Sequence, residues 1–280
     1  MKVNEAMMKS VSIVGCGWFG LPLAKALVKA GFDVRGSKRS KAQAMLLAQE
    51  RISGFCLDLD DSETPCVELA ESVKSQLDSD YLVVNVPPGF RHDPDAYLRR
   101  LTQLKVWVSD CHYQRIIFIS STGVYPSQNQ IVTESDAKMH SLASEHLLKA
   151  EQVFTDLAQT CVLRFAGLVG PKRHPGRFLS GKQNIAGGES PVNLVHLTDC
   201  VRAVIHILSA EKVQPVYNLC ALKHPTRARF YQVASMHLNL AEPIFNDVEV
   251  AGKTVDGRFI TQDLGFEYQF SDPMSMLNDC

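Results

Sequence analysis

The stretch VSIVGCGWFGLPLAKALVKAG, residues 11–31, decides the fold of this chain. Its first four residues form an apolar, mostly β-branched run, which is typical of a buried strand. The pattern G-x-G-x-x-G follows at Gly15, Gly17 and Gly20, and an Ala- and Leu-rich helical pattern comes directly after it. This placement between a strand and a helix predicts a dinucleotide site, with the phosphates at the helix N-terminus. A purely structural glycine turn is the alternative interpretation.

Composition and charge argue against several classes of function and location. The net charge of -1 gives no basic field, so nucleic acid is not an expected partner. The eight cysteines contain no C-x-x-C pair, and no His, Cys or carboxylate cluster has metal-like spacing, so we expect reduced thiols and no metal. Lys25 and Lys29 interrupt the first apolar segment, which argues against a signal peptide. No apolar run is long enough for a transmembrane helix. We therefore expect a cytoplasmic protein without a membrane partner.

The order of strand-like and helical segments predicts an α/β protein. Expected strands alternate with expected helices, which is typical of a doubly wound parallel sheet of about seven strands, the Rossmann fold. We expect residues 1–165 to form an NAD(P)-binding domain. Residues 166–280 are expected to form a smaller substrate-binding lobe, interleaved with the sheet. The helices are expected at 41–51, 94–109, 141–159, 197–208 with Thr198 as its cap, and 224–238.

The end of the second expected strand bears on the choice of cofactor. NAD-binding versions of this fold place an acidic residue there, whereas a 2′-phosphate requires cations. Here the strand is followed by Ser37, Lys38 and Arg39, without a carboxylate. We therefore predict NADP, with NAD possible and a solvated basic turn as the alternative. The other expected cofactor contacts lie in the glycine turn and at strand ends: Trp18, Phe19, Asp58, Val86, Pro87 and Pro88.

Several later segments resemble one enzyme family. The fifth expected strand ends in SSTGVYP, residues 120–126, which resembles the extended short-chain dehydrogenase/reductase family of NAD(P)-dependent epimerases and dehydratases. LRFAGLVGP at 163–171 and NLVHLTD at 193–199 resemble further segments of that family. YNLCALKHPTR at 217–227 and LGFEYQFSDP at 264–273 are similar to its YeeZ-like atypical branch. The glycine pattern alone also resembles UDP-glucose and β-hydroxyacid dehydrogenases, but their other motifs do not appear.

The resemblance also shows a departure from the family. Its reaction uses a Tyr-x-x-x-Lys pair on the helix after strand five, where Lys lowers the pKa of the tyrosine that acts as acid or base. Aligning Ala150 with the family's pattern places Ala143 at the Tyr position and Leu147 at the Lys position. The sequence has no tyrosine between Tyr125 and Tyr217, so no change of register restores the pair.

The resemblance implies which residues remain for chemistry. Ser121 corresponds to the family's Ser/Thr and, with Thr122, is expected to orient the reacting oxygen near the nicotinamide; capping of the strand end is the alternative. Tyr125 could supply a phenol nearby, although the corresponding tyrosine of the family is usually structural.

A basic stretch in the second half predicts where a substrate binds. Lys172–Phe178, KRHPGRF, places three cations and a histidine together, which suits an anionic substrate; a solvated loop is the alternative. The predicted substrate-binding residues from this stretch and from the family-like segments are Arg164, Arg173, His174, Arg177 and His196. His196 lies in an apolar run, so a core histidine is its alternative role. Arg227 and His224 are further candidates for a pocket wall.

Two functions are compatible with these features. The first is an NAD(P)-dependent oxidoreductase or epimerase/dehydratase-like enzyme for a small anionic or nucleotide-linked substrate. The second is a non-catalytic sensor that binds NADP(H) and reports its state to a partner. The resemblance also implies a homodimer.

Overall fold

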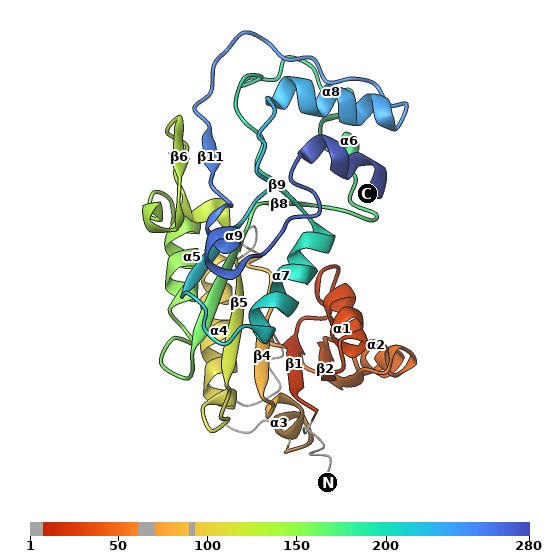
Figure 1. The fold of residues 1–280 in the computed structure, drawn as a ribbon, viewed down its shortest axis with the longest axis vertical. Coiled ribbons are helices and arrows are strands. Elements are labelled where there is room, and N and C mark those ends of the chain that lie inside the picture. Colours follow the sequence, from red (N-terminus) through yellow and green to blue (C-terminus); the bar gives the residue numbers. More distant parts are fainter. Residues whose placement is uncertain (1–7, 61–70, 90–92) are drawn as a thin grey trace. The chain divides into compact units, whose positions relative to one another are not determined.

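The computed structural model describes residues 8–60, 71–89 and 93–280 (Figure 1). The chain divides into two compact units. Unit 1 comprises Met1–Ile119 and Lys149–Val162, and unit 2 comprises Ser120–Leu148 and Leu163–Cys280. The chain thus passes from one unit to the other three times, after Ile119, after Leu148 and after Val162.

The central sheet confirms the predicted Rossmann fold. Its seven strands have the order β10-β7-β5-β4-β1-β2-β3, and the order reverses between β1 and β4, as in a doubly wound sheet. Neighbouring strands pair in parallel, for example Val11 with Val34 and with Tyr81. The strands are β1 (Ser10–Val14), β2 (Asp33–Lys38), β3 (Ser53–Cys56), β4 (Tyr81–Val84), β5 (Arg115–Ser121), β7 (Thr160–Phe165) and β10 (Val216–Leu219).

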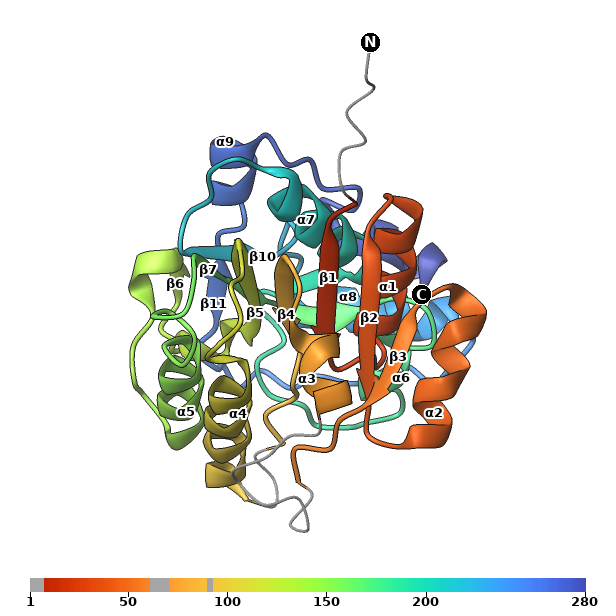
Figure 2. The same ribbon diagram turned by 90° about the horizontal axis from the view of Figure 1, so that it is seen from below.

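Unit 1 buries its central strands because their residues are apolar on both faces. Val11, Ile13 and all of β4 are inaccessible or nearly so, as expected for strands covered by helices on both sides. Helix α1 packs on β1 and β2, and α2 packs on β2 and β3. Figure 2 shows β1 to β4 side by side with these helices around them. The helices of unit 1 are α1 (Gly20–Lys29), α2 (Lys41–Met45), the 3₁₀ helix η1 (Leu46–Glu50), α3 (Glu71–Leu77) and α4 (Pro94–Val108).

Unit 2 adds short elements around two small parallel sheets, β11–β6 and β8–β9. None of the described helices, in either unit, is long and apolar enough to cross a membrane. The remaining elements are η2 (Thr122–Val124), β6 (Gln130–Val132), η3 (Glu134–Asp136), α5 (Leu142–Glu151), β8 (Gly167–Val169), α6 (Gly176–Leu179), β9 (Leu194–His196), α7 (Leu197–Ser209), α8 (Arg227–His237), β11 (Lys253–Val255), α9 (Phe259–Leu264) and η4 (Pro273–Asp279).

Several predicted helix boundaries were wrong. Helix α2 ends at Met45 and is followed by η1, and α8 begins at Arg227 rather than at residue 224. Helix α5 ends at Glu151 rather than near residue 159, because the next amides bond three residues back and the chain turns. This turn buries Phe154 against Phe118. Helix α7 begins at Leu197, and its N-cap is His196, whose Nδ1 accepts from the Thr198 N–H at 3.2 Å. Thr198 therefore lies inside the first turn instead of capping it.

Candidate functional site

The three glycines of the turn between β1 and α1 differ in how much space a side chain would have. Gly15 has φ +103°, and a Cβ there would lie 2.3 Å from the Asn85 carbonyl oxygen. A Cβ on Gly20 would lie 2.2 Å from the Gly15 carbonyl oxygen. A Cβ on Gly17 would meet nothing within 4 Å. The chain itself therefore requires Gly15 and Gly20, whereas Gly17 leaves an open backbone that a ligand can approach.

Two polar side chains hold this turn in place. The Gly15 N–H donates to the Ser37 hydroxyl at 2.9 Å, and the Asn85 amide donates to the Gly15 carbonyl at 3.0 Å. Ser37 is buried, and its own carbonyl accepts from the Cys16 N–H at 3.0 Å. Ser37, predicted as a cofactor contact, thus has an internal role in shaping the turn. Asn85 was not predicted, although its place directly after a buried strand is a usable signal.

The start of α1 suits an anion. Phe19 stands at the N-cap without a side-chain cap, and the first turn contains no acidic residue. The helix N-terminus carries a partial positive charge, and the first turn has no carboxylate of its own to neutralise it. Phe19 is buried, and Trp18 is half-buried. The open backbone at Gly17 and the uncapped helix start fit the pyrophosphate of a dinucleotide.

The basic corner lies at the end of β2. Lys38 is the last residue of that strand and is half-buried, and Arg39 is exposed. Burial raises the pKa of the Cys16 thiol to about 12, and the Lys38 charge opposes this rise. Lys38 lies next to the glycine turn, because the preceding residue, Ser37, accepts hydrogen bonds from the Gly15 and Cys16 N–H groups. Asp33 lies at the opposite end of β2, where it pairs with Arg35 at 3.6 Å.

The other predicted cofactor contacts occupy loops of unit 1. Asp58 follows β3, and its carboxylate accepts from the Asp60 N–H at 3.1 Å, which accounts for one of its oxygens. Val86, Pro87 and Pro88 follow β4 and Asn85, with Pro87 exposed and the other two half-buried. Their contact with a cofactor stays a prediction.

In unit 2, the turn after β5 is held by internal hydrogen bonds. The Ser121 hydroxyl accepts from the Gly123 N–H at 3.1 Å and caps η2, and Ser121 is half-buried. Thr122 is buried, and its carbonyl accepts from the Lys253 ammonium at 2.8 Å. The Leu147 side chain lies 3.3 Å from where a Cβ on Gly123 would stand.

Tyr125 and Arg164 belong to one buried network. Tyr125 is fully buried, and its hydroxyl donates to the Asn218 side-chain oxygen at 2.7 Å. The Arg164 guanidinium donates to the same hydroxyl at 2.7 Å and to the Glu134 carbonyl at 2.8 Å. Burial raises the pKa of Tyr125 to about 12, so the phenol stays protonated at neutral pH. The side chains of Tyr125 and Arg164 therefore have a structural role in this network.

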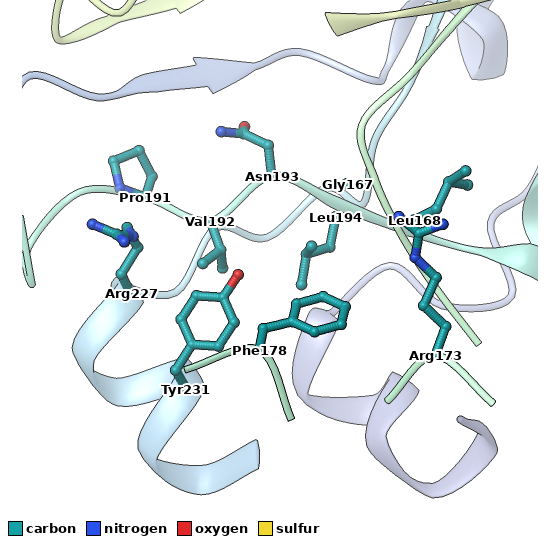
Figure 3. Close-up of a pocket in the computed structure, with 10 residues that line it drawn as sticks. All are labelled: Gly167, Leu168, Arg173, Phe178, Pro191, Val192, Asn193, Leu194, Arg227 and Tyr231. Atoms are coloured by element: carbon teal, nitrogen blue, oxygen red, sulfur yellow. The ribbon is translucent and has the colours of Figure 1, made fainter. Parts of the chain in front are cut away.

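A pocket of about 270 Å³ opens in unit 2 beside α8 (Figure 3). Two aromatic rings, Phe178 and Tyr231, face Val192 and Leu194 across it. Two guanidinium groups, of Arg173 and Arg227, also line the pocket. Its lining residues are Gly167, Leu168, Arg173, Phe178, Pro191, Val192, Asn193, Leu194, Arg227 and Tyr231. An aromatic floor with cations beside it suits an anionic group attached to a planar or apolar body.

Two contacts fix the cationic and polar edge of the pocket. Arg227 donates to the carbonyls of Ala186 and Gly187 at 2.9 and 3.2 Å, which orients its guanidinium. The Asn193 side chain accepts from the Val255 N–H at 2.8 Å and donates to the Lys253 carbonyl at 2.8 Å. These hydrogen bonds fix two residues of the pocket wall through contacts within the chain.

The predicted substrate-binding residues do not form one site, and only Arg173 lines the pocket. Arg173 lines the pocket, whereas Arg177 is exposed and does not line it. His174 is buried, and its Nε2 lies 3.2 Å from Nδ1 of His237. His196 is buried at the N-cap of α7. Arg164 lies in the Tyr125 network.

Comparison with known proteins shows the family of this chain. The family model described as "NAD dependent epimerase/dehydratase family" matches residues 11–220, from β1 through the pocket strands to the residue after β10. The chain belongs to that family. It is 38% identical over 275 residues to Protein YeeZ of Escherichia coli (strain K12), covering 96% of this chain and 99% of that protein.

Solved structures share the fold of this epimerase/dehydratase family member. The structure of MoeE5 in complex with UDP-glucose and NAD has a TM-score of 0.76 at 18% identity, covering 96% of each chain. UDP-glucuronic acid 4-epimerase from Bacillus cereus, in complex with UDP-glucuronic acid and NAD, has a TM-score of 0.75 at 16% identity, covering 96% of this chain and 97% of that one.

Sequence reasoning missed part of this family member's pocket. Phe178 belonged to the basic stretch, but its ring was not predicted to face a ligand. Tyr231 lies four residues after Arg227, so both project from the same side of α8. That spacing is the signal that could have found it.

Proposed function

We propose that the protein is an NAD(P)-dependent oxidoreductase or epimerase/dehydratase-like enzyme, and that it acts on a small anionic or nucleotide-linked substrate. The pocket of unit 2 carries this proposal, because it combines Arg173 and Arg227 with the rings of Phe178 and Tyr231. Membership of the epimerase/dehydratase family supports the cofactor class.

The proposed cofactor is NADP, bound at the glycine turn. The Gly17 backbone and the start of α1 would hold the pyrophosphate, and Lys38 and Arg39 would hold the 2′-phosphate. When bound, the nicotinamide supplies the acceptor or donor of a hydride. The two structural neighbours described above are complexes with NAD, so the proposal of NADP rests on the basic corner and on the absence of a carboxylate between residues 34 and 40.

The proposed substrate is anionic because two guanidinium groups line the pocket, and that of Arg227 is already oriented. Arg227 is fixed by two carbonyls, which lowers the ordering cost of binding a carboxylate or phosphate. The aromatic floor suits a nucleoside or sugar body. Two structural neighbours of the family bind UDP-sugars, which supports a nucleotide-linked substrate.

Ser121 is the proposed orienting group for the reacting oxygen. Its hydroxyl accepts one hydrogen bond from Gly123 and retains its own proton for donation to a substrate oxygen. The phenol of Tyr125 already has two partners, Arg164 and Asn218, so it is a poorer candidate for proton transfer.

A specific observation favours the alternative, a non-catalytic NADP(H) sensor. Ala143 and Leu147 stand where the resemblance places the family's Tyr and Lys. Leu147 is buried against Gly123, so hydrocarbon occupies the place that the resemblance assigns to an amine. A sensor needs the glycine turn but not an acid or base.

Calorimetric titration with NADP, NADPH, NAD and NADH tests the cofactor. We expect micromolar NADP(H) binding, weakened at least about tenfold in the Lys38→Ala/Arg39→Ala variant, since losing one ion pair with phosphate removes about 1.4 kcal/mol. The matched control is Lys41→Ala, which removes a cation from the first turn of α2. Failure of all four nucleotides to bind would contradict the proposal.

Titration with UDP and UDP-glucuronic acid tests the pocket, with Arg227→Met as the variant and Arg229→Met as the exposed control on the same helix. Binding lost only in Arg227→Met supports a nucleotide-linked substrate. Hydride exchange with a bound UDP-sugar then separates the enzyme from the sensor. Redox-selective NADP(H) binding without any exchange would favour the sensor.

A further inference from the structure

Lys253 of β11 bonds to the turn that carries Ser121. Its ammonium donates to the Thr122 carbonyl at 2.8 Å and also to the Tyr125 carbonyl. The side chain is half-buried, and burial lowers the pKa of Lys253 from its ordinary value. The two carbonyl oxygens replace water that the ammonium loses on burial. The Lys253 side chain is therefore committed to this turn.

One peptide group connects Lys253 with Ser121. The Thr122 carbonyl, which accepts from Lys253, and the Gly123 N–H belong to the same peptide unit, and this N–H donates to the Ser121 hydroxyl at 3.1 Å. Because a peptide unit is planar, fixing the direction of its carbonyl also fixes the direction of its N–H. The ammonium also polarises the carbonyl, which strengthens the hydrogen bond that the N–H donates. Lys253 thus acts on the Ser121 hydroxyl through this peptide.

The backbone of β11 also connects the turn to the pocket. The Asn193 side chain, which lines the pocket, donates to the Lys253 carbonyl and accepts from the Val255 N–H, both at 2.8 Å. The same strand pairs in parallel with β6, with Lys253 opposite Gln130 (Figure 1). Lys253 therefore has its backbone at the pocket wall and its ammonium at the Ser121 turn.

We propose that Lys253 is a positioning residue for Ser121, because it holds the Thr122–Gly123 peptide and thereby gives the Ser121 hydroxyl a fixed direction relative to the pocket wall. This inference rests on the proposed function, in which Ser121 orients the reacting oxygen of the substrate. The Gly123 N–H occupies one lone pair of the hydroxyl, and the hydroxyl proton remains for the substrate oxygen. A polarised Gly123 N–H draws electron density from the Ser121 oxygen, which makes that proton a better donor.

A double-mutant cycle on unfolding tests this link without requiring any activity. The variants are Lys253→Met, Ser121→Ala and the two combined, and denaturant titration gives the unfolding equilibrium constant of each. Groups that act independently multiply their effects. If Lys253 acts through the peptide, the combined effect should differ from the product of the single effects by about threefold or more. Effects that multiply within about twofold would overturn the proposal.

The matched control for this cycle is Lys138→Met. The Lys138 N–H donates to the Val124 carbonyl of the same turn, and the substitution keeps this bond. The Lys138 ammonium instead bonds the Gln128 side chain at 3.3 Å. We therefore expect Lys138→Met and Ser121→Ala to act independently. A coupling as large as that of Lys253→Met would mean that any lost lysine near the turn gives the effect, and would overturn the proposal.

Amide spectra supply a readout that a general loss of stability would not move. In protein labelled with ¹⁵N-glycine, we expect the Gly123 amide proton to move upfield in Lys253→Met, because the N–H of a less polarised peptide donates a weaker hydrogen bond. The signal should keep its position in Lys138→Met. A Gly123 signal that does not move in Lys253→Met would overturn the proposal.

A measurement on the unaltered protein keeps the test decisive if Lys253→Met folds poorly. The two carbonyls that accept from the Lys253 ammonium should slow the exchange of its protons with water, so that their ¹⁵N-coupled signals are visible at neutral pH. Lys138 is exposed, and its ammonium protons should exchange faster. Equal exchange at the two ammonium groups would overturn the proposal.

Hydride exchange with UDP-glucuronic acid and NADP separates this inference from the proposed function. Where the unaltered protein shows exchange, Lys253→Met should lower kcat about tenfold or more and leave KM within about twofold, because the carbonyl that Asn193 binds is kept. A raised KM with unchanged kcat would mean that Lys253 serves the pocket instead of Ser121, and would overturn the proposal. If the unaltered protein shows no exchange, the proposed function fails, while the unfolding cycle and the Gly123 signal still decide whether Lys253 holds Ser121.

Discussion

The glycine turn of unit 1 and the turn at residues 121–125 of unit 2 each follow a buried strand of the central sheet, yet they satisfy their polar groups differently. In the first, Gly15 and Gly20 are fixed by backbone crowding, and Gly17 leaves the chain open. In the second, the polar groups of Ser121 and Tyr125 bond to neighbours within unit 2. The first turn therefore leaves backbone at Gly17 open, whereas the second is held by its own hydrogen bonds. Substitutions in the two turns should therefore have separable effects on stability and on ligand binding.

The largest effect is expected from Gly15→Ala. The left-handed backbone and the contact with the Asn85 carbonyl should together lower the free energy of unfolding by about 3 kcal/mol or more, measured by denaturant titration. Gly17→Ala is the control, since its Cβ meets nothing; it should change stability by about 0.5 kcal/mol at most and weaken NADP binding. Equal stability losses in the two variants would contradict the distinction between the glycines.

Tyr125→Phe should have the next largest effect. It leaves Arg164 and Asn218 without one partner each, which should cost about 1–3 kcal/mol of unfolding free energy. NADP binding at the glycine turn should be unchanged, because the hydroxyl bonds only within unit 2 among the described contacts. If stability is kept but hydride exchange is lost, Tyr125 is a catalytic residue and the second turn is not merely structural.

Ser121→Ala should have the smallest effect on stability. The lost cap to the Gly123 N–H should cost about 0.5–1 kcal/mol, measured by thermal unfolding. Any hydride exchange should nevertheless be abolished if Ser121 orients the substrate oxygen. Thr122→Val is a useful companion, since Thr122 is buried and its carbonyl, which the change keeps, binds Lys253. Full exchange in Ser121→Ala would remove Ser121 from the proposed mechanism.

Most of the fold could be predicted because its signals are local. Residues 81–84 form a continuous apolar run, and residues 11–14 are mostly apolar; both are central parallel strands. The glycines of the turn were found for the same reason, since their spacing is set within six residues. Asp93 as cap and Pro94 in the first turn begin α4 where the pattern placed it.

The site in unit 2 was harder to predict because its residues meet through tertiary packing. Arg173 and His174 are neighbours in sequence, yet one lines the pocket and the other bonds to His237 on α8. Nothing in the basic stretch distinguishes them. The cap of α7 was assigned to Thr198 because hydroxyl residues dominate N-caps, but the His196 ring takes the cap position and accepts from the Thr198 N–H itself.

Ser37 sets a limit for anyone who would redesign the cofactor preference of this protein. Its hydroxyl accepts from the Gly15 N–H, so the residue that shapes the phosphate turn stands directly before the residue proposed to read the ribose. An acidic substitution intended to favour NAD has to be made at Lys38 or Arg39. An acidic substitution of Ser37 would instead put a carboxylate at the buried position of the Ser37 hydroxyl. Ser37, which shapes the turn, and Lys38, which is proposed to select the cofactor, are thus neighbours on β2, and only Lys38 can be changed without disturbing the turn.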